Sequence, residues 1–242
     1  MRLTAADRIK AEQLKQAAST GINPYKPQAD QPIAQPMPTT LAHYQLALKS
    51  DLATLQALRT VEEKVAFKRE VIKGYLPFVQ DYINSDKHYA NPVAVRTMVW
   101  LFDIDDIERG IAVALKLIKQ QQAMPSNFDR DLPTFLCDAV YDWANTLLEK
   151  KESAEPYLKQ VVDQVSAWDL HPAVSGKMYV MAAKHSVSDA NNAYENLDID
   201  EALIGYKNAV LQCEQAENAN KKAGAKTLKA KAQAGIDRCN KV

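Results

Sequence analysis

From Thr40 onward, apolar residues recur at steps of three and four, the spacing that places them on one face of an α-helix. The first such run consists of Leu41, Tyr44, Leu48, Leu52, Leu55 and Leu58. The alternating pattern typical of strands is not sustained, and glycine occurs only seven times in 242 residues. The sequence therefore predicts an all-α fold, a helical bundle of antiparallel helix hairpins with a flexible N-terminal arm and a flexible C-terminal tail.

Prolines and caps set the expected helix boundaries. A second helical run begins near Val61, and we expect Pro77 to interrupt it because proline removes a backbone donor. Asn91 followed by Pro92 is typical of a helix start, with asparagine as the N-cap and proline at the first helical position. Later helices are expected over residues 133–150, 156–168, 172–185 and 199–217.

Five of the eleven prolines lie within residues 23–40 and predict an extended spacer. This spacer separates a short basic amphipathic segment, residues 3–19, from the helices. We accordingly divide the chain into four segments. They are a basic N-terminal segment with its linker (1–40), a hairpin that is the candidate DNA-binding or oligomerisation region (41–90), a helical-repeat-like body (91–217) and a basic C-terminal tail (218–242).

Charge is unevenly distributed although the formal net charge is zero. Residues 1–102 carry 13 Lys and Arg against 9 Asp and Glu (+4), residues 103–218 carry 10 against 20 (−10), and residues 219–242 carry 7 against 1 (+6). Basic flanks that contact a polyanion would explain this arrangement, and so would ordinary solvated surface.

The remaining bulk features predict a cytoplasmic protein. The sequence has no run of about 18 apolar residues, so no membrane helix is expected. The N-terminal residues do not resemble a signal peptide. Cys137, Cys213 and Cys239 are odd in number and widely spaced, which favours reduced thiols.

The acidic cluster Asp103, Asp105, Asp106 and Glu108 could suggest a metal site, but helical spacing on its C-terminal side favours a helix start. We expect Asp103 to be the N-cap and Asp106 to answer it three residues later. The same design recurs at Asp198, with a small residue one turn into each helix. Helix pairs over 92–121 and 172–217 of the tetratricopeptide kind are therefore expected.

No catalytic or cofactor motif emerges from the residues. The four histidines lack metal-ligand spacing, and neither a phosphate-binding loop nor a nucleophile elbow is present. Glu149-Lys150-Lys151 has the letters of an E-x-K nuclease signature, yet it ends an expected helix. We predict no metal, no cofactor and no catalytic residue.

Several ordered motifs resemble the gpM family, the small terminase subunits of temperate, contractile-tailed phages of the peduovirus type. The first motif is W-x-x-D-x-x-D-I, formed by Trp100, Asp103, Asp106 and Ile107. It is followed by Met124-Pro125 and by the D-x-x-E-A-L helix that contains Asp198 and Glu201. Upstream, the stretch from Lys64 to Pro77 is similar to K-x-x-x-K-R-E…L-P. The resemblance covers about residues 40–215.

The resemblance implies a part in packaging phage DNA. A small subunit of this family would recognise the cohesive-end site on double-stranded phage DNA, assemble with itself as a ring, and pass the DNA to the ATPase large terminase subunit. The family is often labelled an endonuclease subunit, but the residues show no nuclease constellation. We therefore assign the cutting to the large subunit.

We predict that exposed basic side chains make the DNA contacts. The candidates are Arg59, Lys64, Lys68, Arg69 and Lys73 near the second helix, and Lys221, Lys222, Lys226, Lys229 and Lys231 near the C-terminus. A solvated helix face and a disordered solubilising tail are the respective alternatives. The three tryptophans are expected in the core.

Two rival functions remain at this point. One is a helical-repeat adaptor that binds proteins and has no DNA affinity. The other is an autonomous Mg²⁺-dependent endonuclease, as the family label suggests.

Overall fold

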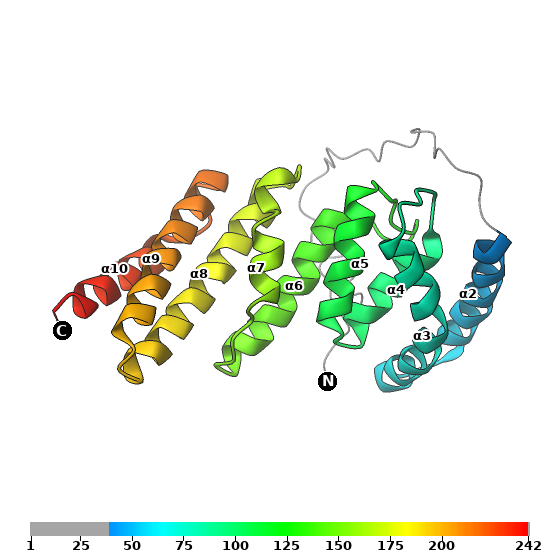
Figure 1. The fold of residues 1–242 in the computed structure, drawn as a ribbon, viewed down its shortest axis with the longest axis horizontal. Helices are drawn as coiled ribbons and strands as arrows, with labels where there is room; N and C mark the ends of the chain where they lie inside the picture. The colour runs from blue at the N-terminus through cyan, green and yellow to red at the C-terminus, as the bar shows by residue number, and fades with distance from the viewer. Residues whose placement is uncertain (1–38, 242) are drawn as a thin grey trace. The chain divides into compact units, whose positions relative to one another are not determined.

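The computed structural model describes residues 39–241, and within them the regular secondary structure is helical (Figure 1). The all-α prediction is confirmed. The predicted N-terminal basic segment and nearly all of the proline-rich linker lie outside the described residues. The helices are α2 (Thr39–Ala57), α3 (Val61–Asn84), α4 (Pro92–Asp103), α5 (Ile107–Lys119), α6 (Leu132–Glu149), α7 (Tyr157–Val162), the 3-10 helix η1 (Val165–Ala167), α8 (Pro172–Glu195), α9 (Ile199–Ala219) and α10 (Lys226–Cys239).

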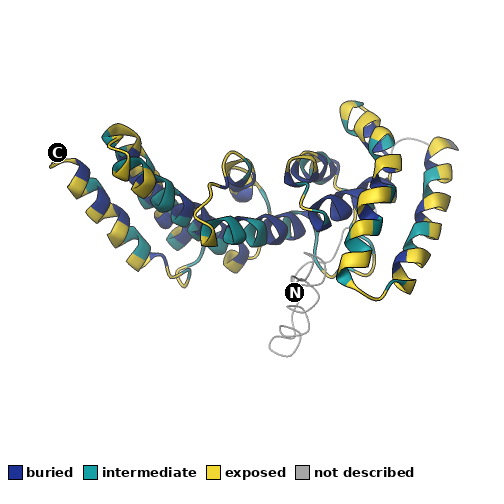
Figure 2. Cartoon of the chain, turned by 90° about the horizontal axis from the view of Figure 1, so that it is seen from below, coloured by how far each residue is buried: buried dark blue, intermediate teal, exposed yellow. Residues whose placement is uncertain are grey.

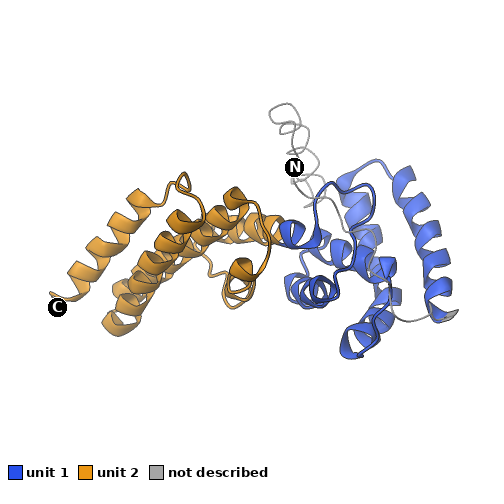
Figure 3. Cartoon of the chain, turned by 90° about the horizontal axis from the view of Figure 1, so that it is seen from above, with its two compact units in different colours: residues 1–136 blue, residues 137–242 orange. Residues whose placement is uncertain are grey.

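The chain divides into two compact units, residues 1–136 and 137–242 (Figure 3). Their boundary falls within α6. In each unit the buried residues lie on the helix faces that turn toward other helices, and the exposed residues lie on the outer faces (Figure 2).

The first unit is built around α4, whose residues are buried on nearly every side. A helix that is apolar all round must be covered by others, and α2, α3 and α5 each pack against it. Asn91 caps α4 by accepting a hydrogen bond from the Ala94 N–H at 3.0 Å, as predicted. Trp100 is buried and meets Tyr75 edge to face, with ring centroids 5.7 Å apart.

The helix α3 continues through Pro77, where the sequence predicted an interruption. Proline leaves the carbonyl four residues earlier without its usual donor, but tertiary packing outweighs this cost. Ile72 and Tyr75 before the proline and Val79 and Tyr82 after it are all buried. They hold both halves of the helix against the same core.

Two glutamines at the end of α5 fix the segment that joins α3 to α4. Tyr82 Oη donates to Gln120 Oε1 at 2.6 Å, and Gln120 Nε2 donates to the Lys87 carbonyl at 2.8 Å. The Gln122 amide bonds to the Tyr89 carbonyl and accepts from the Asn91 N–H, both at 2.8 Å. Burial raises the pKa of Tyr82 to about 12. The sequence reasoning missed this polar cluster, which sets the position of α3.

In the described part of the chain, α4, α5, α6 and α8 end in the same way. The residue one past each C-cap adopts a positive φ, and the next N–H bonds back to a carbonyl five residues earlier, a Schellman motif. These left-handed residues are Asp105, Gln121, Lys151 and Leu197, with φ of 65°, 52°, 57° and 65°. After α4 and α8, an N-cap aspartate follows at once, so the next helix starts with almost no connecting loop.

The second unit is dominated by the packing of α8 against α9. The helix α8 continues to Glu195, ten residues beyond its expected end, and the expected helix over 156–168 is split into α7 and η1. Small residues allow close approach: a Cβ on Gly205 of α9 would lie 2.8 Å from the Ala190 Cβ of α8. Whether the helix pairs are of the tetratricopeptide kind stays a prediction.

Contacts between α6 and α8 join the start of this unit to its centre. His185 is buried, and its Nε2 lies 2.9 Å from the Ala144 carbonyl, to which it donates. Lys177 forms an ion pair with Asp138 and lies over the Tyr141 ring. Trp143, which is partly buried, meets Tyr157 edge to face.

The C-terminal segment is not the flexible tail that we expected, because Lys226–Cys239 forms α10 and packs on α9. Gly235 lets the two helices approach, since a Cβ there would lie 2.6 Å from Tyr206 ring carbons. The Arg238 guanidinium lies 4.0 Å from the Tyr194 ring centroid and donates to Tyr206 Oη at 2.6 Å. Ala232 and Cys239 complete the buried face.

Candidate nucleic-acid interface

The ten predicted basic contacts fall into two groups, one in each compact unit. The first group lies at the start and middle of α3, and the second lies in the α9–α10 turn and on α10.

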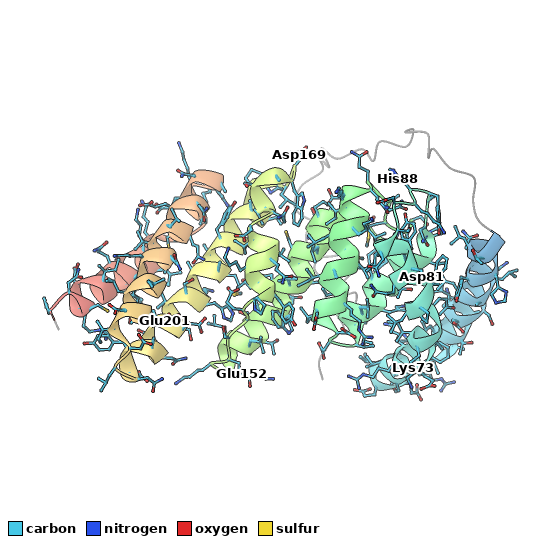
Figure 4. All side chains as sticks on the ribbon, viewed as in Figure 1. Lys73, Asp81, His88, Glu152, Asp169 and Glu201 are labelled. Atoms are coloured by element: carbon cyan, nitrogen blue, oxygen red, sulfur yellow. The ribbon has the colours of Figure 1, made fainter. Side chains whose placement is uncertain are left out.

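The first group is interleaved with acidic side chains. Arg59 and Arg69 are exposed, and Lys64 is half-buried. Lys73, labelled in Figure 4, forms an ion pair with Glu70 at 2.6 Å one turn away. The charges of Lys73 and Glu70 compensate each other. The outer face of α3 therefore attracts a polyanion less strongly than its number of lysines suggests.

The start of α3 explains the acidic side chains beside Arg59. Thr60 is the N-cap, and its hydroxyl accepts from the Glu63 N–H at 3.1 Å. The Glu63 carboxylate accepts in return from the Thr60 and Arg59 N–H groups, at 3.0 and 3.1 Å. These backbone hydrogen bonds lower the pKa of Glu63. The Glu63 carboxylate thus serves as the hydrogen-bond acceptor for backbone N–H groups at the start of the helix.

Lys68 differs from the other predicted contacts because it is buried. Its Nζ lies 2.7 Å from Asp103 Oδ2, and the two side chains are 10% and 1% exposed. An ammonium held in this way is not available to a phosphate. Lys68 is therefore removed from the set of candidate DNA contacts.

Asp103 is correspondingly not the N-cap that the sequence predicted. It is the last residue of α4, and its carboxylate turns inward to Lys68. Burial lowers the pKa of the nearby Arg96 guanidinium, and the Asp103 carboxylate opposes that shift. A cap can be predicted because its hydrogen-bond partner lies about three residues away in the sequence. The partner of Asp103, Lys68, is 35 residues away.

Asp106, which we expected to answer a cap at Asp103, is itself the N-cap of α5. Its carboxylate accepts from the Arg109 N–H and from Arg109 Nε, the latter at 2.7 Å. This side-chain hydrogen bond raises the pKa of Arg109. Ile107 begins the helix and is buried, and a Cβ on Gly110 would lie 3.1 Å from the Phe102 ring, so the expected close approach at this small residue is confirmed.

Asp198 plays the same part at the start of α9. Its Oδ1 accepts from the Glu201 N–H at 3.1 Å, and Glu201 lies in the exposed first turn (Figure 4). The two acidic motifs are thus the same helix start used twice, as the sequence predicted.

The second basic group is more exposed and less neutralised. Lys221, Lys222, Lys226 and Lys231 are exposed. Lys229 is half-buried and pairs with Glu214 at 2.9 Å, a contact that raises its pKa. After residue 218 the sequence contains one acidic residue, Asp237. Because α10 is a packed helix, these lysines are held on a defined surface.

Within residues 39–241, no three His, Cys, Asp or Glu side chains gather closely enough to hold a metal ion. Over the same range, no helix has the length and apolar character needed to cross a bilayer.

Comparison with known proteins identifies similar chains. A family model described as phage small terminase subunit matches residues 45–173, just over half of the chain. A Haemophilus phage HP1 protein, named probable terminase, endonuclease subunit, is 32% identical over 197 residues, which are 81% of this chain and 67% of that protein. The terminase, endonuclease subunit of Escherichia phage P2 is 25% identical over 149 residues, 60% of each chain. No solved structure matches.

Proposed function

This chain belongs to the family of phage small terminase subunits, which serve the packaging of phage DNA, and we propose that it binds double-stranded phage DNA at the cohesive-end site. In this proposal it also assembles with itself and delivers the DNA to the ATPase large subunit in the host cytoplasm. The aligned parts are 67% and 60% of the two relatives' lengths.

One observation supports the DNA contact most strongly: the exposed lysines of the α9–α10 turn and α10. Four of them are exposed on a packed helix and its preceding turn, with one acidic residue in the whole segment. Lysine ammonium groups contact phosphate oxygens without reading sequence. This surface would supply affinity, and site choice would come from other contacts or from the deformability of the DNA.

The secondary contacts in this proposal are Arg59, the half-buried Lys64, Arg69 and Lys73. Glu63 and Glu70 lie among them, so each cation on α3 contributes less to the attraction of phosphate. Weak contacts become effective when several copies act together, because each further contact is then intramolecular. Self-assembly is therefore part of the proposed recognition.

Cutting of the DNA is assigned to the large subunit, although both relatives are named endonuclease subunits. Two of the four carboxylates in the cluster at 103–108 have structural partners, since Asp103 pairs with Lys68 and Asp106 binds Arg109. Glu149 of the E-x-K letters accepts from the Asn145 amide at 2.9 Å. Supercoiled DNA incubated with purified protein and Mg²⁺ should remain intact without the large subunit, and nicking would contradict this assignment.

Fluorescence anisotropy with a labelled cohesive-end duplex at low salt tests the DNA contact. We expect binding by the wild type and at least tenfold weaker binding by a K221Q/K222Q/K226Q/K231Q variant. An adaptor without DNA affinity would show no binding to the duplex even at low salt. A scrambled duplex of equal length separates site preference from general attraction to phosphate.

A further inference from the structure

The helix α2 has an apolar face that nothing in the described part of the chain covers. Leu46 is 72% exposed, and Ala42, Ala53 and Ala57 share its face at helical spacing. Within Thr39–Ala57 only Lys49 and Asp51 are charged at neutral pH, against 25% charged residues in the whole chain. Asp51 accepts a hydrogen bond from Tyr75 Oη at 2.5 Å, which leaves Lys49 as the charge on the outer side.

A second apolar face lies along α9. Ile204 and Leu211 are each 55% exposed and lie seven residues apart, so they share one side of the helix. Leu197, which lies two residues before α9 begins, is 84% exposed. It also has a φ of 65°, a conformation that favours glycine or asparagine. The same left-handed conformation ends α4, α5 and α6, so it is the exposed apolar side chain of Leu197 that favours a contact outside the chain.

The charges beside the two faces are opposite. Asp198, Asp200 and Glu201 are at the start of α9, beside its apolar face, and they outnumber the exposed lysine on that side of the helix, Lys207. Lys49 is beside the apolar face of α2. Two copies of the α2 face would bring two ammonium groups together, and two copies of the α9 face would bring carboxylates together. Each face therefore suits the other better than it suits itself.

We propose that the α2 face (Ala42, Leu46, Lys49, Ala53 and Ala57) of one copy packs against the α9 face (Leu197, Asp200, Glu201, Ile204 and Leu211) of the next. The inference rests on the proposed self-assembly and names the two surfaces through which the copies would make contact. A contact between two different faces leaves one free face at each end of a growing assembly, so the assembly grows beyond a dimer and ends as a ring where the rotation between copies closes. A contact of one face with itself would stop at a dimer.

The test compares L46E with I204E/L211E by multi-angle light scattering of the full chain. All three side chains are exposed, so each variant should fold, which circular dichroism and urea unfolding will check. We expect wild type to form assemblies larger than a dimer and each variant alone to be a monomer. An equimolar mixture should form a one-to-one heterodimer and nothing larger, because only one intact pair of faces remains.

Charge reversal gives an independent arm of the same experiment. K49E should weaken self-association at least tenfold, and D200K/E201K should restore it when mixed with K49E. The matched control is Q80E, which adds an equal charge to the exposed side of α3 and should leave the mass unchanged.

Three results would overturn the proposal. They are a monomeric wild type at all concentrations, a wild-type mass in either variant, or a mixture that fails to form the heterodimer. A monomeric wild type would mean that another segment, such as residues 1–38, or the large subunit covers these faces. DNA binding of L46E to a short duplex is measured separately, so loss of assembly with intact binding leaves the DNA function standing, and assembly without binding does the reverse.

Discussion

Lys68 Nζ and Asp103 Oδ2 lie 2.7 Å apart inside the first unit and join the middle of α3 to the end of α4. Both charges are removed from water, so each depends on the other for its solvation. The pair explains why a lysine and an aspartate that look solvent-exposed in the sequence are instead part of the fold.

Removal of one partner should be costly. D103A leaves the Lys68 ammonium buried without its carboxylate, and we expect a loss of about 3–5 kcal/mol in the free energy of unfolding by urea. E70A breaks the exposed pair with Lys73 and should change the stability by less than about 1 kcal/mol. K68M should retain wild-type affinity for DNA, and a salt-dependent loss of affinity in K68M would contradict the structural role of Lys68.

Glu63 should make the stability depend on acid. Backbone hydrogen bonds lower its pKa in the folded state, so its contribution is present above the unfolded pKa of about 4.5 and is lost as the pH falls through the folded value. E63Q keeps an acceptor but removes the charge. The stability difference between wild type and E63Q should be largest near pH 7 and should shrink toward pH 3.

The comparison for Glu63 is E62Q, which removes an equal charge from the same helical turn. Its effect should vary less with pH, because Glu62 does not form the capping box. A wild-type minus E63Q difference that stays constant from pH 7 to pH 3 would show that the charge of Glu63 plays no part.

Leu197 should be a site where stability and assembly conflict. L197G removes a β-carbon from a left-handed residue and should raise the free energy of unfolding by about 0.5–1 kcal/mol. The same change at Leu211, within α9, should lower it by about 1 kcal/mol. Both variants should self-associate less. If L197G proves less stable than wild type, the left-handed strain at this position is not real.

Gly235 should tolerate no larger residue if α10 packs as described. A Cβ there would lie 2.6 Å from the Tyr206 ring, and overpacking of this kind costs about 1–3 kcal/mol. G74A is the matched control, since a Cβ at Gly74 meets nothing within 4 Å and alanine favours a helix by about 0.5–1 kcal/mol. Thermal unfolding should therefore shift in opposite directions, and an unchanged G235A would mean that α10 is the flexible tail first expected.

Local features of the sequence predicted local structure well. Asp198 and Asn91 were recognised as caps because a cap bonds to an N–H two or three residues away. At the start of α5 the cap was placed three residues too early, at Asp103 instead of Asp106. The helices α4, α5, α6, α8 and α9 were likewise found from apolar residues that repeat along one face.

Features that depend on distant partners were not predicted. Asp103 has the local sequence context of a cap, but its carboxylate pairs with Lys68 of α3. The helix α10 lacks a stripe of large apolar residues, since it buries Ala232, Gly235 and Cys239 against Tyr206 and its neighbours. In the sequence, the lysines of this segment are more conspicuous than its small buried residues. Small residues reveal a buried face only when the partner helix is known.

The salt dependence of DNA binding tests the central claim most directly. Each lost phosphate contact should reduce the slope of log K against log salt by about 0.9, so K222Q/K226Q should lower it by about 1.8. K119Q/K150Q removes the same charge from exposed positions on α5 and after α6 and should leave the slope unchanged. Equal slopes for the two double variants would contradict the proposal that the lysines of the α9–α10 turn and α10 hold the DNA.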